Sequence, residues 1–453
     1  AMLPPNWEKQ LVDLNVTKLT DKDIAWADYV FLSAMAVQRE SVQQVISMCK
    51  GVGVKIVAGG PLFTQEYEDF GDIDYFVLNE AEVTLPSFLR DLEKGNARRI
   101  YRTSEFPDIQ KTPVPLWDLI DLKRYASMSI QFSRGCPYNC EFCNVTALLG
   151  HRPRTKTAMQ IIAELDSLYD LGWRGGIFFV DDNLIGNKRC LETELLPALI
   201  EWRKDKKVGL FSTEVSINLA DDESLMHLMA QAGFGAVFVG IETPDANSLT
   251  ECCKTHNKNR DLLRDVKTIH RSGLQVMGGF IVGFDSDPPS IFQRQIDFIQ
   301  QSGIVTAMVG MLQAPPGTRL FERLARDHRV SDEFSGDNVD GRTNIIPAMG
   351  LDRLIDGYRD IMQYIYAPRN YYQRVRRILK ELKNPAVTTP ADWQGILAFL
   401  RAGLRLGILG KERFQYWRLL AWTLARRPRL LSLAVTLSIY GYHYRRVCEL
   451  HIL

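Results

Sequence analysis

Three cysteines within a short run are the residues of this sequence best suited to do chemistry. Cys136, Cys140 and Cys143 follow the spacing C-x3-C-x2-C in the run SRGCPYNCEFC. Three thiolates can bind three irons of a [4Fe–4S] cube and leave the fourth iron free to bind a substrate. A zinc site needs a fourth ligand, usually from a second close pair. The other close pair, Cys252 and Cys253, is adjacent in the sequence and therefore poorly spaced for one metal ion. The spacing therefore predicts an iron–sulfur cluster with one open iron.

Two regions of alternating strands and helices must position this motif. Residues 8–90 and residues 125–320 both alternate apolar strands with helices, which predicts α/β domains with parallel sheets. In the second region we expect a partial (β/α)6 barrel with strands at 129–134, 176–182, 210–217, 236–242, 274–283 and 304–312. Ligands of such sheets bind beyond the carboxyl ends of the strands. The cysteine run follows the first of these strands, so we expect it at that edge.

The first region is predicted to be a doubly wound sheet. Its expected strands are 11–14, 29–33, 55–61 and 75–78, with a helix at 40–50. Because the chain enters the first of these strands almost at once, we expect that an N-terminal piece of this domain is missing. Tight turns follow three strands, and glycines in the second turn would allow a close approach of backbone and ligand.

Polar residues end several apolar strands of the second region. Asp181, Asp182 and Asn183 follow one strand, and Glu214, Ser216, Glu242 and Gln313 lie at the ends of others. Packing explains a carboxylate at such a position poorly, although some of these residues could cap the next helix. We therefore treat this set as candidate ligand contacts.

The composition predicts a large folded protein of a reducing compartment. Of 453 residues, 46% are hydrophobic, which is enough for two or three domains. The eight cysteines are sparse and irregularly spaced, as is typical of a reduced cytoplasmic protein. No basic segment followed by an apolar run opens the sequence, so we expect no signal peptide.

The C-terminal region is helical and basic. From residue 371 onward there are 15 Lys/Arg and 4 Asp/Glu, a charge of +11, while residues 1–370 carry 40 and 50, a charge of −10. Residues 430–442 are apolar but number only 13, too few to cross a bilayer, which takes about 20. Arginines flank this segment at 426, 427, 429, 445 and 446. Two interpretations stay open: an interfacial segment on anionic lipid, or a helix docked on the protein.

The order of regions resembles the cobalamin-dependent radical S-adenosylmethionine (SAM) enzymes. The chain is similar to the branch with a helical C-terminal module that includes hopanoid C-methylases and bacteriochlorophyll side-chain methylases. The stretches that carry the resemblance are VAGGP at 57–61, SRGCP at 133–137, FVDDN at 179–183 and GIET at 240–243. The resemblance implies a cobalamin-binding, Rossmann-like domain at 1–110, a radical SAM barrel at 111–335 and a helical domain at 336–453.

By position, the resemblance implies that the three cysteines bind the cluster and that Phe142 packs against the adenine of SAM. Carboxylates accept hydrogen bonds from hydroxyl and ammonium groups, so the candidates for the ribose and methionine ends of SAM are Asp182, Glu214, Ser216 and Glu242. The candidate cobalamin contacts are Ser33, Met35, Gln38, Gly59, Gly60, Pro61 and Glu80. The first histidine is His151, so residues 1–150 offer no imidazole as a lower ligand of cobalt.

The implied activity is methylation of an unactivated carbon in a small apolar substrate, lipid-like or polycyclic. The implied cofactors are a [4Fe–4S] cluster, two molecules of SAM and methylcobalamin, with a flavodoxin- or ferredoxin-type electron donor. One SAM would give the radical that takes a hydrogen atom from the substrate, methylcobalamin would supply the methyl group, and the second SAM would remethylate the cobalt.

Two other functions stay open. One is a radical SAM cyclase or oxidase that uses cobalamin without methyl transfer. The other is a cobalamin- or redox-sensing binding protein. We expect no nucleic-acid partner, because the barrel is acidic and carries no nucleic-acid-binding motif. We expect a cytoplasmic protein, and the basic C-terminal helices raise the option of peripheral contact with the inner membrane.

Overall fold

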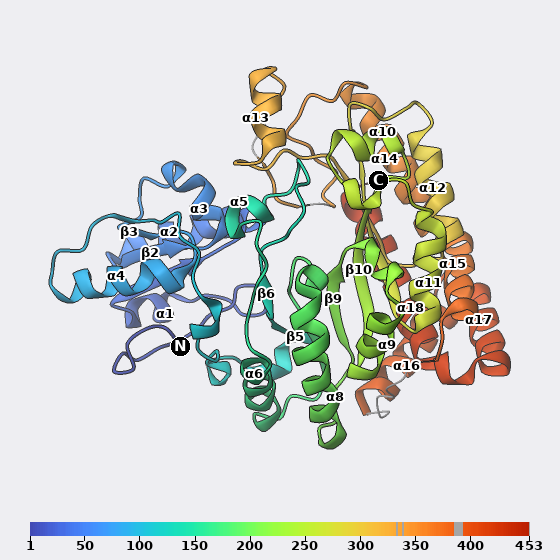
Figure 1. The fold of residues 1–453 in the computed structure, drawn as a ribbon, viewed down its shortest axis with the longest axis horizontal. Helices are drawn as coiled ribbons and strands as arrows, with labels where there is room; N and C mark the ends of the chain where they lie inside the picture. Colours follow the sequence, from blue (N-terminus) through green and yellow to red (C-terminus); the bar gives the residue numbers. More distant parts are fainter. Residues whose placement is uncertain (332–333, 338, 385–392, 453) are drawn as a thin grey trace.

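The chain folds into an N-terminal sheet domain, a central domain with a larger sheet, and a set of C-terminal helices (Figure 1). The computed structural model describes residues 1–331, 334–337, 339–384 and 393–452. In Figure 1 the N-terminal domain lies on one side of the central sheet and the C-terminal helices on the other. This confirms the α/β class and the expected order of the three regions.

The N-terminal domain has four parallel strands in the order β1-β2-β3-β4. Its core contains Leu62, Phe63 and Phe76, which are all at most 1% exposed. The strands are β1 Tyr29–Ser33, β2 Lys55–Gly59, β3 Tyr75–Val77 and β4 Ile100–Tyr101, and the helices are α1 Asp21–Trp26, α2 Arg39–Val52, α3 Pro61–Glu66 and α4 Ala81–Glu93.

The prediction of a strand at 11–14 is wrong. Residues 8–13 have no regular structure, and a turn follows them. Leu11 and Leu14 are 48% and 44% exposed, so this segment has no buried face to hold it in a sheet. Asp13 stabilises the turn by accepting hydrogen bonds from the Asn15 backbone and from the Tyr125 hydroxyl.

The central domain has six parallel strands in the order β12-β11-β10-β9-β8-β5. Its two edge strands, β5 and β12, are not paired with each other among the described residues, so the sheet is a partial barrel. The strands are β5 Ser127–Ile130, β8 Gly176–Phe179, β9 Phe211–Val215, β10 Phe234–Glu242, β11 Gln275–Val282 and β12 Ala307–Met311, and the larger helices are α6 Ala158–Asp170, α8 Leu196–Asp205, α9 Glu223–Ala232, α11 Leu262–Ser272 and α12 Ile291–Ser302. All six predicted strands are therefore confirmed, with shifts of a few residues at their ends.

Alternation along these strands sends aromatic rings into one core. Phe179, Phe211 and Phe234 come from three neighbouring strands, and their ring centroids lie 5.2–5.5 Å apart. Each ring is at most 2% exposed. Edge-to-face and tilted packing at this separation is favourable for aromatic rings. This aromatic core therefore helps to hold the three strands in their observed order.

The C-terminal helices pack on one another and on the central domain. They are α14 Leu351–Tyr366, α15 Pro368–Glu381, α16 Trp393–Gly407, α17 Arg413–Arg426 and α18 Leu431–His451. The apolar segment at 430–442 lies in α18, where Ala434 and Leu437 are fully buried. The Tyr371 hydroxyl donates a hydrogen bond to the Leu437 carbonyl at 2.6 Å. The structure therefore shows a docked helix at this segment. Among the described residues, no helix is both long and apolar enough to cross a bilayer.

Close packing of α18 on α15 gives a testable prediction. A Cβ at Gly441 would lie 2.2 Å from the ring of Tyr371, which is 1% exposed and cannot move aside easily. We expect Gly441→Ala to lower the free energy of unfolding by about 1–3 kcal/mol, although alanine favours a helix. Gly403→Ala is the control, because its Cβ would meet open space. It should stabilise the protein by about 0.5–1 kcal/mol. Equal midpoints of urea unfolding for the two variants would contradict this packing.

Candidate functional site

The cysteine loop begins at the carboxyl edge of the central sheet. Asp181, fully buried after β8, accepts hydrogen bonds from the backbone N–H groups of Phe132 and Ser133 and from the Ser133 hydroxyl. Gly135 follows with φ of 93°, and a Cβ there would lie 2.9 Å from the carbonyls of Gly150 and Arg152. Only glycine fits this close approach, so Cys136 is turned at once toward the sheet edge.

Two other segments hold the loop from outside. The backbone N–H of Glu141 donates to the Cys252 carbonyl at 2.9 Å, and the N–H of Leu320 donates to the Glu141 carbonyl at 3.1 Å. The Glu141 carboxylate pairs with Arg323 of α13 (Arg319–Arg326) at 2.8 Å. The pair Cys252 and Cys253 thus does approach the cysteine loop, through its backbone. The loop is fixed by contacts with residues more than 100 positions away.

The three loop cysteines suit an iron–sulfur cluster. All are free thiols of intermediate exposure. Burial raises the pKa of Cys136, and raises that of Cys140 to about 11 and of Cys143 to about 12. Buried thiolates need cations beside them, and iron ions supply these. Among the described residues, no three His, Cys, Asp or Glu side chains converge on a single ion. A cube does not require this, because each cysteine binds a different iron.

Two carboxylates lie beside the loop with raised pKa values. Burial raises the pKa of Asp182 to about 6, and its Oδ2 is a buried atom with no hydrogen-bond partner. Burial, then the charges of Asp182 and Glu242, raise the pKa of Glu214 to about 7. A buried acceptor without a partner costs free energy unless a ligand satisfies it. The predicted residue Asp182 is therefore close to Glu214 and also to Cys136, whose pKa it raises.

The third carboxylate, Glu242, already has a partner. Its Oε1 accepts a hydrogen bond from Lys254 Nζ at 2.5 Å, and both side chains are nearly buried. Burial would lower the pKa of Lys254, but Glu242 and the sulfur of Cys140 outweigh it and raise that pKa. The Lys254 ammonium also lies 6.0 Å from the ring centroid of Phe142. The sequence did not single out Lys254; its place directly after two cysteines near the predicted site was the available signal.

Phe142 and Ser216 have neighbours of different kinds. Phe142 packs against an apolar cluster that includes Phe284, with ring centroids 6.3 Å apart. The Ser216 hydroxyl donates to Asn218 Oδ1 at 2.6 Å, and its backbone N–H donates to Asn183 Oδ1. Ser216 thus belongs to a network of side chains at the end of β9.

Glu80 joins the N-terminal domain to the central domain. Its carboxylate, in a residue that is 7% exposed, pairs with Arg134 at 2.7 Å and with Arg154 at 2.8 Å. Arg134 also pairs with Glu82 at 2.9 Å. The sequence predicted Glu80 as a cobalamin contact, and the structure places its charge in this interdomain cluster. Neither arginine was predicted.

The remaining candidate cobalamin contacts lie together at the carboxyl edge of the N-terminal sheet. Gly60 has φ of 87°, and a Cβ there would lie 2.7 Å from Ser33 Oγ. A Cβ at Gly59 would lie 2.6 Å from the Val77 carbonyl, and Pro61 starts α3 directly afterward. The loop after β1 is closed by Gln38, whose side-chain oxygen accepts from the backbone N–H of Met35 at 2.9 Å. Met35 itself is 51% exposed.

A cavity of about 1060 Å³ lies where the three regions meet. Gln65 of α3 donates to the Pro316 carbonyl at 2.7 Å, which links the N-terminal sheet edge to the loop after β12. The cavity wall mixes apolar and charged side chains, among them Val37, Arg39, Gln313, Arg342, Ile355 and Val447. Gln313, a predicted strand-end residue, donates to the Asp337 carbonyl in this wall.

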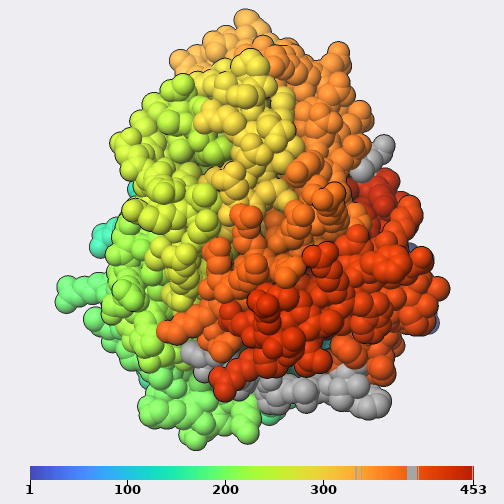
Figure 2. Space-filling model, turned by 90° about the vertical axis from the view of Figure 1, so that its right-hand side faces the viewer, coloured from blue at the N-terminus to red at the C-terminus, as the bar shows by residue number. Residues whose placement is uncertain are grey.

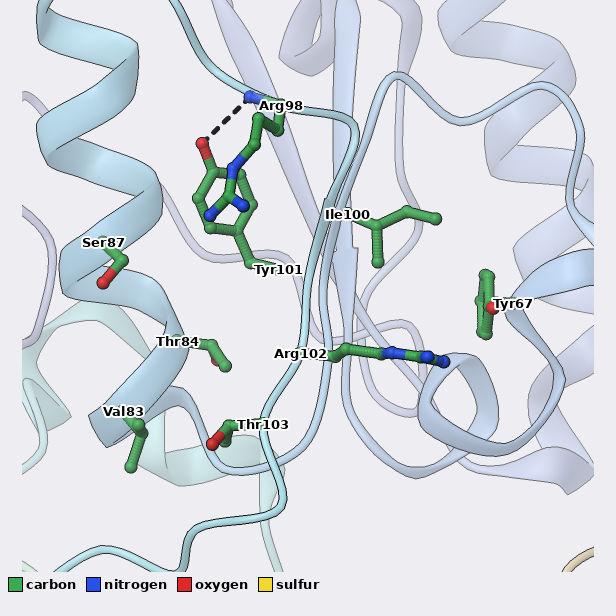
Figure 3. A pocket seen from close by; sticks show the side chains of 9 residues that line it. All are labelled: Tyr67, Val83, Thr84, Ser87, Arg98, Ile100, Tyr101, Arg102 and Thr103. Atoms are coloured by element: carbon green, nitrogen blue, oxygen red, sulfur yellow. Dashed lines mark hydrogen bonds between the residues drawn. The ribbon is translucent and has the colours of Figure 1, made fainter.

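A second cavity, of about 560 Å³, lies at the far edge of the N-terminal sheet. Figure 3 shows Arg98 and Tyr101 on one side of the β4 segment and Ile100 and Arg102 on the other. The backbone N–H of Arg98 donates to the Tyr101 hydroxyl at 2.9 Å. None of the predicted site residues lines this cavity.

The structure places His256 against the cysteine loop. Its ring stacks on Tyr138 with centroids 3.7 Å apart. Burial, then the charge of Lys254, lower the pKa of His256 to about 3. It is thus a neutral ring that supports the loop.

The raised pKa of Glu214 predicts a pH-dependent stability. The ordinary glutamate pKa of 4.5 rises to about 7 in the folded protein, so the folded state holds this proton more tightly than the unfolded chain. Stability from this group is present below pH 4.5 and is lost as the pH rises through 7. In the cofactor-free protein we expect the free energy of unfolding of Glu214→Gln, relative to that of the wild type, to rise by about 1–3 kcal/mol as the pH rises from about 5 to about 8.

Urea unfolding across this pH range measures the effect. Glu194→Gln, a change of an exposed glutamate, is the control and should give a difference that does not vary with pH. Parallel pH curves for Glu214→Gln and the wild type would show that Glu214 is ionised throughout.

Comparison with known proteins places this geometry in a family. Residues 130–299 match the radical SAM superfamily, and residues 318–452 match a domain of unknown function, DUF4070. An uncharacterized methyltransferase, sll1242, from Synechocystis is 39% identical, with coverage of 99% of this chain and 85% of that protein. The hopanoid C-2 methylase of Rhodopseudomonas palustris is 32% identical, with coverage of 92% and 81%.

Solved structures show the same fold. The cobalamin-dependent radical SAM enzyme OxsB, bound to aqua-cobalamin and SAM, superposes with a TM-score of 0.60 at 14% identity and covers 93% of this chain and 68% of its own. The methyltransferase TsrM from Kitasatospora setae gives a TM-score of 0.57 at 16% identity, with coverage of 69% and 68%. The chain therefore belongs to the radical SAM superfamily, in the family of methyltransferases that includes the hopanoid C-2 methylase.

Proposed function

We propose that this protein is a cobalamin-dependent radical SAM enzyme that methylates an unactivated carbon of a largely apolar substrate. The observation that carries the proposal is the cysteine loop, whose start Asp181 holds at the carboxyl edge of the central sheet. The cavity of about 1060 Å³, which we call the junction cavity, has a wall with residues from all three regions and offers space for a ligand. The superfamily and its cobalamin-bound structural neighbours support a [4Fe–4S] cluster, SAM and cobalamin as cofactors. We propose the methyl-bearing form of cobalamin as the donor.

The chain offers a distinct set of residues for each cofactor. Cys136, Cys140 and Cys143 would hold the cluster, which supplies the electron that cleaves SAM. Asp182 would accept a hydrogen bond from a hydroxyl or ammonium group of SAM through its unpartnered Oδ2. Phe142 would pack against the adenine. The pair of Glu242 with Lys254 lies close enough to the loop to influence the charge of Cys140, and Glu214 lies near Asp182 and Glu242.

The turns of the N-terminal sheet would hold cobalamin through backbone atoms. Gly59 and Gly60 let this turn pack directly on the Val77 carbonyl and on Ser33, and we propose that the backbone of the same turn contacts cobalamin. Ser33, Met35, Gln38 and Pro61 border the same edge, and we propose them as secondary contacts.

The junction cavity fits a substrate with an apolar framework and a polar group. Val37, Ile355 and Val447 give it apolar walls, while Arg39 and Arg342 add charge. Ligand sites of this kind are mostly apolar, with a few polar groups that fix orientation. Methyl transfer is favoured over cyclisation or oxidation because relatives across most of this chain are named as methylases or methyltransferases. A product heavier by one methylene unit would distinguish these reactions.

The cluster assignment is tested by Cys140→Ala in the full chain, purified without oxygen and supplied with iron, sulfide, reductant and SAM. We expect loss of most bound iron and of 5′-deoxyadenosine formation, because the iron that Cys140 would bind loses its protein ligand. Cys49→Ala is the matched control, since Cys49 is buried in α2, in the N-terminal domain. It should keep both. Continued deoxyadenosine formation by Cys140→Ala would contradict the assignment.

The cobalamin assignment is tested by Gly60→Ala. Its Cβ would clash with Ser33 Oγ at 2.7 Å and would meet a backbone conformation that alanine disfavours. We expect at least about a tenfold loss of cobalamin retained after gel filtration, with unchanged iron content. Gly71→Ala, whose Cβ meets open space in the same domain, should retain cobalamin. Equal retention by both variants would place cobalamin elsewhere.

A further inference from the structure

One corner of the C-terminal helices exposes an unusual amount of apolar surface. At the turn between α16 and α17, Leu409 and Phe414 are both 74% exposed, and Ile408 is 60% exposed. On the face of the molecule shown in Figure 2, the orange-to-red C-terminal helices form much of the lower part. We call this set the α16–α17 patch; its apolar members are Phe399, Leu400, Leu404, Ile408, Leu409, Phe414, Trp417 and Leu424.

The spacing of these residues makes one stripe on each helix. Leu400, Leu404 and Ile408 recur every four residues along α16 and just past its end, which keeps them on one side of the helix. On α17, Phe414, Trp417 and Leu424 form a similar stripe. The opposite sides face the bundle, where Leu406, Tyr416 and Leu419 are at most 3% exposed.

Trp417 brings the two stripes together. Its indole N–H donates to the Gly407 carbonyl at 2.9 Å, and a Cβ at Gly407 would lie 2.8 Å from the same nitrogen. The glycine at the end of α16 therefore allows the tryptophan ring to cover the helix end. The stripes meet at this corner and form one continuous apolar surface.

Among the described residues of α16, α17 and the turn between them, every exposed charged side chain is positive. Arg401, Arg405, Lys411, Arg413, Arg418 and Arg426 are exposed on the same two helices and their turn. Between residues 393 and 448 the sequence contains a single acidic residue, Glu412. Glu412 is 1% exposed and pairs with Arg445 of α18 at 2.6 Å, so it is turned away from the surface.

We propose that the α16–α17 patch docks on the surface of an anionic lipid bilayer. Aliphatic and aromatic side chains that lie in the headgroup region, with lysines and arginines beside them, are typical of interfacial helices. Each basic residue near an anionic surface adds about 1 kcal/mol. The site differs from the segment at 430–442, which packs one side against the bundle through Leu430, Ala434 and Leu437.

A second copy of this chain is a poorer occupant. A symmetric pair brings the same patch of each copy together. This would set the exposed cations of α16 and α17 against each other, and the described residues of these two helices offer no exposed acid to separate them. An acidic protein partner would match the charge, and the test below separates it from lipid. The inference concerns a surface apart from the cysteine loop, so it does not rest on the proposed function.

The experiment is flotation of the 453-residue, cofactor-free chain with vesicles. We expect the chain to float with vesicles of equimolar phosphatidylglycerol and phosphatidylcholine, to bind much less to phosphatidylcholine alone, and to be released by salt. No flotation with the anionic vesicles overturns the proposal and would leave an acidic protein as the matching partner.

Variants locate the contact. The double variant Leu409→Gln with Phe414→Gln should weaken binding at least about tenfold, and Lys411→Gln with Arg413→Gln should weaken it about tenfold on anionic vesicles only. The controls are Met159→Gln, an apolar residue 73% exposed on α6, and Lys94→Gln, an exposed residue just after α4; both should bind as the wild type does. All variants should keep the wild-type melting temperature.

Two outcomes would overturn the assignment even if the chain binds lipid or associates. Unchanged flotation of the Leu409 and Phe414 double variant would place the lipid contact elsewhere. A change from dimer to monomer on gel filtration for this variant, with no vesicle binding by the wild type, would show an interface between copies. A blue shift of tryptophan emission on vesicle binding, lost in Trp417→Phe, would support the proposal independently.

Discussion

The carboxylate of Asp181 fixes the point from which the cysteine loop departs. It lies at the end of β8, is fully buried, and accepts two backbone hydrogen bonds and one hydroxyl hydrogen bond from Phe132 and Ser133. Burial raises its pKa to about 6, while these hydrogen bonds oppose that change. Because the donors belong to the chain just before the loop, the end of one strand holds the start of the motif on its neighbour. Gly135 then allows the sharp turn that places Cys136 over the sheet edge.

The same edge concentrates ionisable groups that would repel one another in isolation. Burial raises the pKa values of Asp182, Glu214 and the loop thiols, and Lys254 is the buried cation that offsets part of this negative charge. Its contact with Glu242 makes the pair nearly neutral. Groups with such perturbed pKa values are common where a charged ligand completes the site. The geometry is therefore that of a site whose electrostatic balance a bound charged ligand would complete.

Ion pairs rather than a broad apolar core hold the N-terminal domain at this edge. Glu80 with Arg134 and Arg154 forms the centre of the junction, and Gln65 adds a hydrogen bond to the loop after β12. Removing one partner of such a buried pair strongly lowers the free energy of unfolding. These contacts therefore fix how the two sheet edges face each other. The cavity of about 1060 Å³ takes its mixed lining from all three regions of the chain. On the C-terminal helices, by contrast, the exposed apolar corner faces away from the bundle.

The sequence by itself determined the motif and the order of elements, because both are local. The C-x3-C-x2-C spacing and the alternation of strands and helices are set by residues close together in the chain, and all six central strands were found this way. Prediction from the sequence failed at 11–14, where the apolar residues resemble a strand but no neighbouring segment buries them. Only the tertiary structure decided that Glu242 meets Lys254, that Glu80 meets two arginines, and that one side of the segment 430–442 is buried while the α16–α17 patch is exposed. Pairing and burial depend on which distant segments become neighbours, and a residue's own type and local spacing do not contain that information.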